Sequence, residues 1–375
     1  MWRFRRFRLL ALSVLLVAAT VTVVVLLRKI APPEPARLLP GGDAFAYVNL
    51  EWARRATILT GLPQVKRSPD YEKFVQESGV DFERDLEQAA LAAHYPAPGA
   101  SSQSPEAAPR YSAVLVGHLN ATRLASYFRR FARSTDTEQG VEIFNIPLDG
   151  QTLRAAILGP DSVALSNHDD PEVIRGVVVR SRKRASPFGG PGFLRAYYRR
   201  VPLASMAWVI ARVDPRMSPA WSPTAHSDET VVVPNFHLLQ NPAVVVVSAR
   251  VIRDVHLRAE AFTKNADEAR DLTDKVSALL ALVRFSEAET PSGGPDAEVK
   301  AFFQSLQVSQ DKDRAVLTAT MPLGFLRKVF RDPGVASEVG DLPGTTASRA
   351  ATSSIAAPEV GSSANPPKAA AAQPR

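Results

Sequence analysis

The chain has 375 residues, of which 45% are hydrophobic, and a formal net charge of +7 at pH 7. That composition suffices for two ordinary domains and excludes a chain that is disordered throughout. Residues 1–30 contain six basic and no acidic side chains, which leaves 39 basic against 38 acidic residues in 31–375. This near-neutral remainder argues against nucleic acid as a partner. The absence of Cys excludes disulfides, Cys-ligated zinc and a lipid anchor on an N-terminal Cys.

The apolar run at residues 9–27 predicts a transmembrane helix. Its sequence, LLALSVLLVAATVTVVVLL, carries no charge. At about 1.5 Å per residue such a helix is roughly 28 Å long, close to the hydrocarbon thickness of a bilayer. The preceding tail, residues 1–8, holds four Arg, so the positive-inside rule favours a cytoplasmic N-terminus and an extracytoplasmic bulk, periplasmic in a Gram-negative cell. The alternative is a signal peptide cleaved near Ala19, which also exports the domain.

Low-complexity segments separate the remaining blocks. Residues 28–37 contain three Pro, and because Pro fixes φ and disfavours helix before it, we expect an extended spacer that holds the domain off the membrane. The tail 332–375 has almost no large apolar residue. We expect it to be disordered, because it cannot bury enough surface to offset its ordering entropy. Two internal stretches of similar composition are 97–110 and 286–297.

Alternating apolar and polar residues predict strands on both sides of a Gly- and Pro-rich stretch at 186–192. The two longest amphipathic patterns, 122–133 and 266–283, predict helices, and shorter helices are expected at 171–179 and 322–330, each opening on a Pro. The expected strands are 44–50, 112–119, 141–146, 152–158 and 162–166 in the first part, and 205–213, 243–252, 256–262, 306–309 and 314–320 in the second.

Both parts of the chain show the same order of elements: strand, strand, long helix, β-ribbon and short helix. Tyr47 and Trp208 lie in similar strand patterns, and Asn120 and Asn265 each precede a long helix. A repeated order of this kind is typical of a duplicated unit.

We therefore expect an α+β fold with antiparallel sheets in two tandem similar units, residues 38–185 and 193–331, joined by the junction 186–192. The apolar stripes of the two long helices should then occupy equivalent positions, each packed on its own sheet. These stripes are Leu124, Tyr127, Phe128 and Phe131 in the first unit and Leu272, Val276, Leu279 and Val283 in the second.

Two short patterns carry a family resemblance. The Leu-Pro pair that opens LPGGDAFAYV, residues 39–48, leads into the first strand. Gly79-Val80-Asp81 and Asp85-Leu86 precede the next strand. In these patterns the chain resembles uncharacterised bacterial proteins with an N-terminal anchor, notably acidobacterial ones, over most of residues 38–330. The resemblance implies the architecture of an anchored extracytoplasmic protein and brings no catalytic residues with it.

The six His residues do not form the His-x-x-x-His or His-Glu-x-x-His spacing that places two metal ligands on one helix face. The densest polar cluster is His168-Asp169-Asp170. It would suit a metal ion, but it stands directly before Pro171 and Glu172, where capping of a helix accounts for it. We therefore predict no metal and no cofactor.

Motifs for covalent catalysis are also missing. The chain lacks the Gly-x-Ser-x-Gly elbow and any Cys, and the Gly-rich stretch 189–192 lacks the Gly-Lys-Ser/Thr end of a phosphate loop. That stretch is interpreted as a domain junction. Glu83, Asp85 and Glu87 fall in a charged run on a short predicted helix, which surface solvation explains better than glycosidase chemistry.

A basic cluster flanks the proposed junction and is the candidate ligand or partner surface. It would suit anionic lipid headgroups or a polyanionic envelope polymer, although a solvated helix end is the simpler interpretation. Asn120 begins a glycosylation pattern and also suits a helix N-cap. The cluster consists of Arg180, Arg182, Lys183, Arg184, Arg199 and Arg200.

Topology and the missing motifs together predict a non-enzymatic, membrane-anchored, extracytoplasmic binding or scaffold module of the cell envelope. Its expected partners are the membrane, through residues 9–27, and an envelope protein, lipid or polymer. The alternative is an extracytoplasmic hydrolase whose active site uses scattered residues, and a third hypothesis is a periplasmic scaffold that uses the tail 332–375 as a flexible arm. Two similar lobes with an apolar groove would favour binding, and a deep pocket with converging His, Asp and Ser would favour the enzyme.

Overall fold

The computed structural model describes residues 31–55, 67–96, 109–148, 150–183, 189–215, 239–288 and 297–331, together with Thr20 and Thr22. The predicted basic tail 1–8 and the predicted disordered tail 332–375 lie outside these ranges, as does the predicted transmembrane helix 9–27 apart from Thr20 and Thr22. None of the helices in the described ranges combines the length and the apolar character needed to cross a bilayer.

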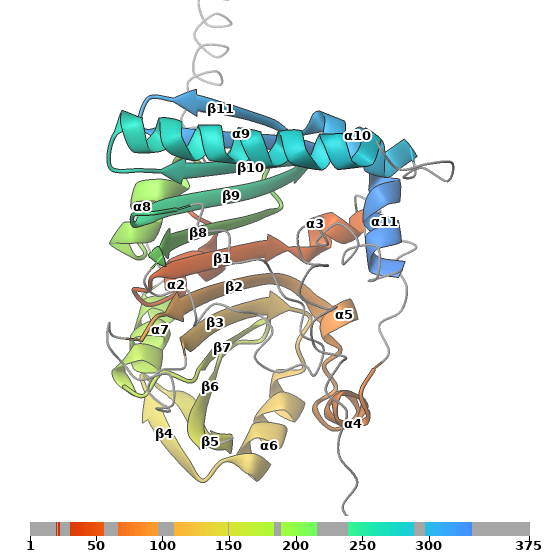
Figure 1. Cartoon of the computed structure of the whole chain (residues 1–375). Coiled ribbons are helices and arrows are strands. Elements are labelled where there is room, and N and C mark those ends of the chain that lie inside the picture. The colour runs from red at the N-terminus through yellow and green to blue at the C-terminus, as the bar shows by residue number, and fades with distance from the viewer. Residues whose placement is uncertain are drawn as a thin grey trace, which may run out of the picture.

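A single antiparallel sheet of twelve strands runs through the molecule (Figure 1), in the order β11-β12-β10-β9-β8-β1-β2-β3-β7-β6-β5-β4. The predicted α+β class with antiparallel strands is therefore confirmed. The expectation of a separate sheet for each unit is wrong, because β1 (Ala44–Asn49) pairs with β8 (Ala207–Val213) and joins the halves. The other strands are β2 (Leu86–His94), β3 (Arg110–Gly117), β4 (Ser134–Glu138), β5 (Val141–Leu148), β6 (Gln151–Gly159), β7 (Ser162–Ser166), β9 (Ala243–Val251), β10 (Val255–Phe262), β11 (Gln307–Asp311) and β12 (Arg314–Met321).

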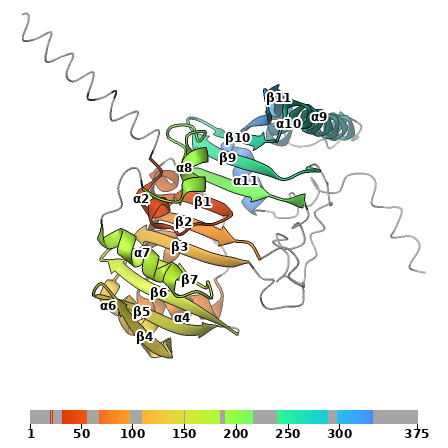
Figure 2. The ribbon, with the colours of Figure 1, turned by 90° about the vertical axis from the view of Figure 1, so that its left-hand side faces the viewer.

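Helices lie on both faces of this sheet (Figure 2). On one, which we call the α7 face, pack α2 (Glu34–Leu38), α7 (Glu172–Arg182) and α8 (Gly192–Tyr198). On the opposite α9 face, α6 (Ala121–Phe131) covers part of the first half, and α9 (Ala266–Ala288) with α10 (Ala297–Ser305) covers part of the second. The remaining helices are α3 (Leu50–Arg55), α4 (Pro69–Ser78), α5 (Phe82–Asp85) and α11 (Leu323–Arg331).

The two halves of the sheet are connected in the same way. In the first half the strands neighbour one another as β1-β2-β3-β7-β6, and in the second as β8-β9-β10-β12-β11. In each half a long helix follows the third strand, and the chain then returns as a ribbon that pairs with that strand. The first half differs in having two further strands, β4 and β5, at its edge.

The halves meet at one pair of aromatic residues. Tyr47 on β1 lies directly opposite Trp208 on β8, and their rings stack with centroids 5.6 Å apart. Residues on either side pair symmetrically: Ala46 with Val209, and Val48 with Ala207. The local arrangement therefore has approximate twofold symmetry about the Tyr47–Trp208 pair, and positions in the two halves can be matched by counting outward from it.

The two long helices begin in the same way. The side chain of Asn120 accepts a hydrogen bond from the backbone N–H of Arg123 at 3.0 Å, and Asn265 accepts one from Glu268 at 2.8 Å. Each bond satisfies a donor that a helix leaves free at its N-terminus, and such a cap is worth about 1 kcal/mol. The interpretation of Asn120 as an N-cap is confirmed.

The two apolar stripes differ in burial. Leu124 and Phe128 of α6 are buried and pack around Phe144 of β5, whereas Phe131 is 44% exposed. In α9 only Leu272 of the predicted stripe is buried; Val276 and Leu279 are partly exposed, and the side chain of Val283 lies outside the described part of the structure. The helix of the second half therefore covers its part of the sheet less completely than α6 does.

Two segments differ from the sequence-based expectations. Residues 28–37 do not stand clear of the domain as an extended spacer over the part that is described, because Ala36 and Leu38 of α2 are buried in the core of the α7 face. The strand β2 was not predicted, since LEQAALAAH is rich in Ala, which favours helix. Its pairing with β1 and β3 on both sides overrides that preference. The helices α8 and α10 were also not predicted.

Candidate functional site

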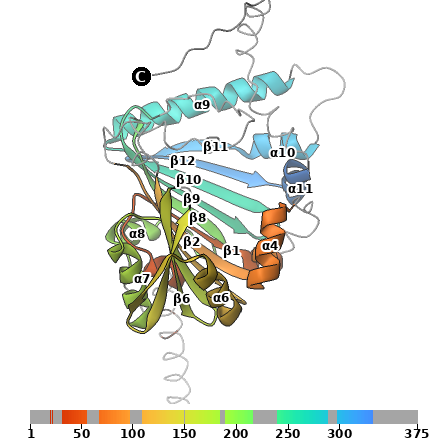
Figure 3. The same ribbon diagram turned by 90° about the horizontal axis from the view of Figure 1, so that it is seen from below.

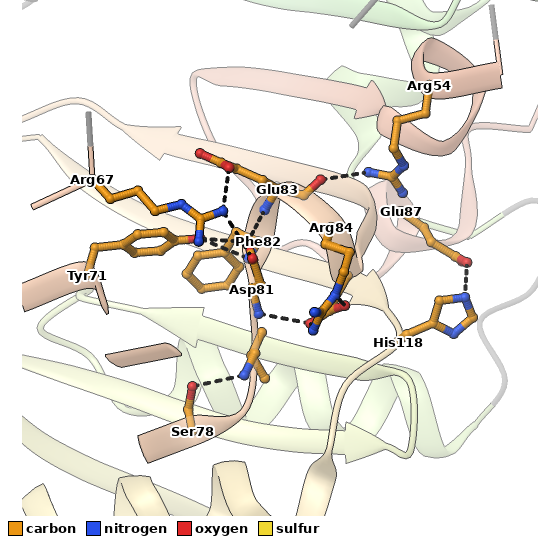
Figure 4. Close-up of polar contacts among 12 residues, drawn as sticks. Arg54, Arg67, Tyr71, Ser78, Asp81, Phe82, Glu83, Arg84, Glu87 and His118 are labelled. Carbon is orange, nitrogen blue, oxygen red and sulfur yellow. Dashed lines mark hydrogen bonds and ion pairs between the residues drawn. The ribbon is translucent and has the colours of Figure 1, made fainter. Parts of the chain in front are cut away.

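The densest network of polar contacts surrounds α5, where the chain turns into β2 (Figure 4). Asp81 caps this helix by accepting a hydrogen bond from the backbone N–H of Glu83 at 3.1 Å, and it also accepts bonds from Arg67 and Tyr71. Asp85 accepts the backbone N–H of Asp81 at 2.9 Å. Asp81 and Asp85 are both buried, at 7% exposure each.

Asp85 is held as a carboxylate in this network. The hydrogen bond from Arg84, whose Nε lies 2.7 Å from Oδ1, lowers the pKa of Asp85 in spite of its burial. The backbone oxygen of Asp85 accepts a hydrogen bond from the backbone N–H of His118 at 2.8 Å. This oxygen lies so close to Gly117 that a Cβ there would be 2.1 Å away. An ionised, fully hydrogen-bonded carboxylate is a poor proton donor or nucleophile, so this corner fixes the start of β2 rather than performing chemistry.

The three carboxylates of the charged run, Glu83, Asp85 and Glu87, differ in burial and in their partners. Surface solvation was expected for all of them, and for Asp85 that expectation is wrong because the residue is buried. Glu83 is exposed and forms an ion pair with Arg67 at 2.7 Å, and Glu87 lies 3.1 Å from His118. The Gly-Val-Asp and Asp-Leu patterns that carry the family resemblance are thus the residues that build this corner.

The His168-Asp169-Asp170 cluster lies at the start of α7. Asp170 accepts a hydrogen bond from the backbone N–H of Glu172 at 2.9 Å, and Asp169 pairs with Arg110 at 3.0 Å. These contacts fit the capping interpretation. Among the described residues, no group of three or more His, Cys, Asp or Glu side chains is arranged to hold a metal ion.

The predicted basic surface is divided between two helix ends. Arg182 and Lys183 are exposed at the end of α7, whereas Arg180 is partly buried and donates from Nε to the backbone oxygen of Leu38 at 2.8 Å. Burial lowers the pKa of Arg180. Arg184 lies outside the described residues. The other two residues, Arg199 and Arg200, follow α8, and the guanidinium of Arg200 lies 5.4 Å from the centre of the Phe262 ring.

A polar pocket of about 390 Å³ opens beside that second helix end, on the α7 face of the second half. Its floor is formed by two neighbouring rows of side chains: the first crosses β9, β10, β12 and β11, and the second crosses β9, β10 and β12 and ends on the last residue of α10. Pro202, which follows α8, lines its rim. The first row consists of Ser248, Arg258, Thr318 and Gln307, and the second of Arg250, His256, Thr320 and Ser305.

The matching row in the first half is entirely apolar. Counted outward from Tyr47, the paired residues are Ala90, Val114, Ala164 and Ala156, where the second half has Ser248, Arg258, Thr318 and Gln307. All four residues of the first half are almost completely buried, at 0–1% exposure. The same positions of the same topology are therefore core in one half and pocket floor in the other.

The placement of the covering helices explains this difference. In the first half, α2 packs on β2 and β3, and α7 follows β7 and packs back over β6 and β7, where Ile174, Val177 and Val178 are buried. In the second half the corresponding helix α11 follows β12 but lies beside α10, at the side of the sheet (Figures 1 and 3). There the Phe325 ring stacks on Phe302 with centroids 5.0 Å apart. Within the described residues, the α7 face over β11 and β12 is left without a helix.

Charge inside the pocket is predominantly positive. Arg250 and Arg258 line it, whereas Asp and Glu are absent from its lining. Beside the pocket, the buried Glu260 accepts hydrogen bonds from Arg258 Nε at 2.6 Å and from Arg314 at 2.9 Å. Arg314 also pairs with Asp311. These two carboxylates compensate only part of the positive charge of the three arginines Arg250, Arg258 and Arg314.

Several pocket donors have no partner among the described residues. Across the described ranges, the side chains of Arg250, Thr318 and Gln307 make no hydrogen bond, and Arg258 uses only Nε. His256 lies 3.3 Å from the hydroxyl of Thr320 through Nδ1. An array of exposed donors on a rigid sheet can bind a ligand that carries acceptors, because the donors are already held in place.

The opposite face of the sheet is chemically different at its centre. A groove of about 340 Å³ there is floored by small aliphatic side chains of β1, β2, β8 and β9, among them Ala46, Val48, Leu91 and Val209. These side chains have no hydrogen-bonding group and cannot select a polar ligand. The polar pocket is therefore the better candidate for specific recognition.

The sequences of β9 and β10 indicate a polar strand face where the pocket lies. Polar residues alternate with apolar ones at Ser248 and Arg250 in β9, and at His256 and Arg258 in β10. An alternation of this kind marks one face of a strand as polar. It does not tell on its own whether the polar face meets a helix, open solvent or a ligand.

Comparison with known proteins adds no argument about this chain. No protein-family model and no curated protein matches the chain. Among solved structures, crystal forms III and IV of TP0453 are each 11% identical, with a TM-score of 0.43, and cover 80% of this chain and 98% of theirs. Crystal form I of TP0453 is 10% identical, with a TM-score of 0.40, and covers 84% of this chain and all of its own. A likeness at this level carries no functional argument.

Proposed function

We propose that this protein is a membrane-anchored, extracytoplasmic binding module of the cell envelope that holds a polar ligand in the pocket of its second half. The observation that carries the proposal is the row of Ser248, Arg258, Thr318 and Gln307, which replaces a fully buried apolar row of the first half. An uncovered face of an antiparallel sheet is ordinarily polar, so the support comes from the cavity that this row lines and from those of its donors that make no hydrogen bond within the described residues.

The matched topology supports a further part of the proposal, that the two halves derive from one duplicated unit. Strand order, the Asn caps of both long helices and the symmetric pairing about Tyr47 and Trp208 agree with this origin. In such a pair one copy retains the closed arrangement under α7. The other copy has exchanged its core row for a binding surface while α11 packs elsewhere.

The short segment between the proposed transmembrane helix and α2 would hold the module close to the bilayer. The apolar run 9–27 ends shortly before Pro32, which is buried, and before α2, which packs into the core. The connecting residues 28–33 can span at most roughly 20 Å when fully extended. A ligand for this module would therefore be met at or near the outer surface of the membrane.

Side-specific labelling tests the location. The natural chain has no Cys, so a Gln307→Cys variant places a single thiol at the exposed edge of the pocket. A membrane-impermeant maleimide should label it in intact spheroplasts to the same extent as after lysis. Labelling only after lysis would place the pocket in the cytoplasm and overturn the proposal.

A hydrolase remains the second candidate, on the basis of one contact. The hydroxyl of Thr320 lies 3.3 Å from His256, a nucleophile and a base in the same pocket. In the described residues no carboxylate contacts His256 to orient it, which favours binding over catalysis. Turnover of an ester or phosphoester substrate that is abolished in Thr320→Val would establish the enzyme instead.

The scaffold hypothesis differs in where it places function. It assigns the activity to the tail 332–375, whereas the binding proposal assigns it to residues of the sheet. Deleting the tail should therefore leave ligand binding by the full sheet unchanged. A loss of binding on that deletion would favour the scaffold.

A further inference from the structure

We propose that the pocket is specific for a small ligand with an oxyanion group, a carboxylate or a phosphate, which Arg250 and Arg258 bind together. This inference rests on the proposed function and names the ligand class of the same site. The two arginines come from adjacent strands, β9 and β10, and both line the cavity.

The hydrogen-bonding state of the two arginines points to an anion. Arg258 is fixed by the bond from its Nε to Glu260 at 2.6 Å, so its two terminal nitrogens are oriented without being used by the described residues. Arg250 is exposed, and its whole guanidinium lacks a partner within the same residues. A guanidinium offers a planar fork of donors that matches carboxylate and phosphate oxygens in two parallel bonds.

Buried Glu260 makes this orientation possible without cancelling the charge. It is 4% exposed and lies between Arg258 and Arg314, each of which donates to one of its oxygens. Arg314 is shared with Asp311. Glu260 therefore acts as a positioning residue beside Arg258 on the same face of β10, and the pocket keeps the uncompensated positive charge of Arg250 together with the free terminal nitrogens of Arg258 within the described residues.

The rest of the lining extends the ligand class. Thr318 and Gln307 supply a hydroxyl and an amide that have no partner in the described structure, and the ring of His256 lies in the second row. These groups suit hydroxyls beside the oxyanion. The volume of about 390 Å³ lies at the small end of the range for ligand pockets, which fits a small molecule better than a long polymer.

Calorimetric titration of the full chain in detergent micelles with three matched probes tests the inference. Glycerol 3-phosphate and glycerate carry an oxyanion and hydroxyls, and glycerol carries hydroxyls alone. We expect at least one of the two anions to bind and glycerol to bind much more weakly. Arg250→Gln and Arg258→Gln should each weaken the binding of that anion by roughly ten- to a hundredfold, the effect of losing charge-assisted hydrogen bonds.

Control variants separate the site from general charge. Arg270→Gln removes the same charge from an exposed position of α9, on the opposite face of the sheet, and should leave affinity unchanged. Arg250→Lys should recover only part of the affinity, because Lys lacks the fork. Since Arg250 is exposed, its variants should keep the wild-type melting temperature, and a folding defect in Arg258→Gln would not obscure the result.

Three outcomes overturn the oxyanion inference: equal binding of glycerol and the anions, an equal loss in Arg270→Gln, or no binding of either anion at millimolar concentration. Equal binding of glycerol would leave the proposed binding function standing and change only the ligand class. Failure of the proposed function itself has a separate signature, the absence of maleimide labelling at Gln307→Cys in spheroplasts.

Discussion

The two halves of the sheet show how the positions of the covering helices decide the character of a surface. In the first half, α2 packs on β2 and β3 while α7 returns over β6 and β7, and the residues beneath these helices, Val114 and Ala164 among them, are small, apolar and buried. In the second half α11 packs on α10 instead, and the matched residues Arg258 and Thr318 line an open pocket. The five matched strands of each half have the same order and the same register at this row, so topology alone does not determine where a site forms.

The most severe test of this comparison exchanges matched residues. Val114→Arg places in the first half the side chain that Arg258 provides in the second. In the core beneath α2 and α7 that charge would be buried without a partner, and we expect a loss of more than about 4 kcal/mol in the free energy of unfolding, or failure to fold. Urea denaturation followed by circular dichroism measures it. A loss below about 1 kcal/mol would show that the first half is not closed.

The long helices should respond unequally to truncation. Phe128 of α6 is 8% exposed, and Phe128→Ala should lower the free energy of unfolding by about 3–5 kcal/mol. Leu279 of α9 is partly exposed, so Leu279→Ala should cost about half as much or less. Both values come from the same denaturation series. Equal losses would mean that α9 covers its half as tightly as α6 does.

A smaller effect is expected in the polar network around α5, at the start of β2. The matching segment before β9 in the second half lies partly outside the described residues. Asp85→Asn removes the carboxylate that Arg84 and the backbone N–H of Asp81 share, and should cost about 1–3 kcal/mol. The exposed Glu83 is a matched control, since Glu83→Gln should cost less than about 1 kcal/mol. Equal effects of the two variants would contradict the assignment of Asp85 as the structural carboxylate.

The smallest effect concerns pH. Burial, with a contribution from His168, lowers the pKa of His94, whereas the matched residue Ile252, directly after β9, is 71% exposed. Because the folded-state pKa lies below the unfolded value of about 6.5, this contribution to stability is complete above that pH and is lost as the pH falls through the folded-state pKa. In His94→Asn the melting temperature should fall less steeply than in the wild type as the pH is lowered below about 6.5. Thermal melts over a series of pH values measure this. An unchanged decline in His94→Asn would contradict the role of His94.

How much of this molecule the sequence predicts depends on which forces decide each element. The strands of the sheet were predicted from their alternation, except β2 and β4. The sequence of β4, STDTE, has no apolar residue to alternate, and the Ala-rich sequence of β2 favours helix, so only its two neighbours in the sheet make it a strand. The caps at Asn120 and Asn265 are local interactions between residues three apart, and so they could be read from the sequence.

The candidate pocket could not be predicted in the same way. Most of its residues lie on β9, β10, β11 and β12, and the register that aligns Ser248 with Arg258, Thr318 and Gln307 is a property of the paired strands. Whether that row is covered depends on the direction that α11 takes after Pro322, which is decided by packing against α10. The basic residues of 180–200 were conspicuous in sequence, but Arg180 is engaged with the backbone of Leu38.

Thiol accessibility at matched positions tests the central claim, that the second half is open where the first is closed. Ala164 and Thr318 occupy the same place in the two halves, and the natural chain has no Cys to interfere. In the purified full chain, the thiol of Thr318→Cys should react with a maleimide at a rate close to that of an unfolded control. Ala164→Cys should react at least about a thousandfold more slowly, because its thiol is reached only through opening of the core. Equal rates at the two positions would contradict the account.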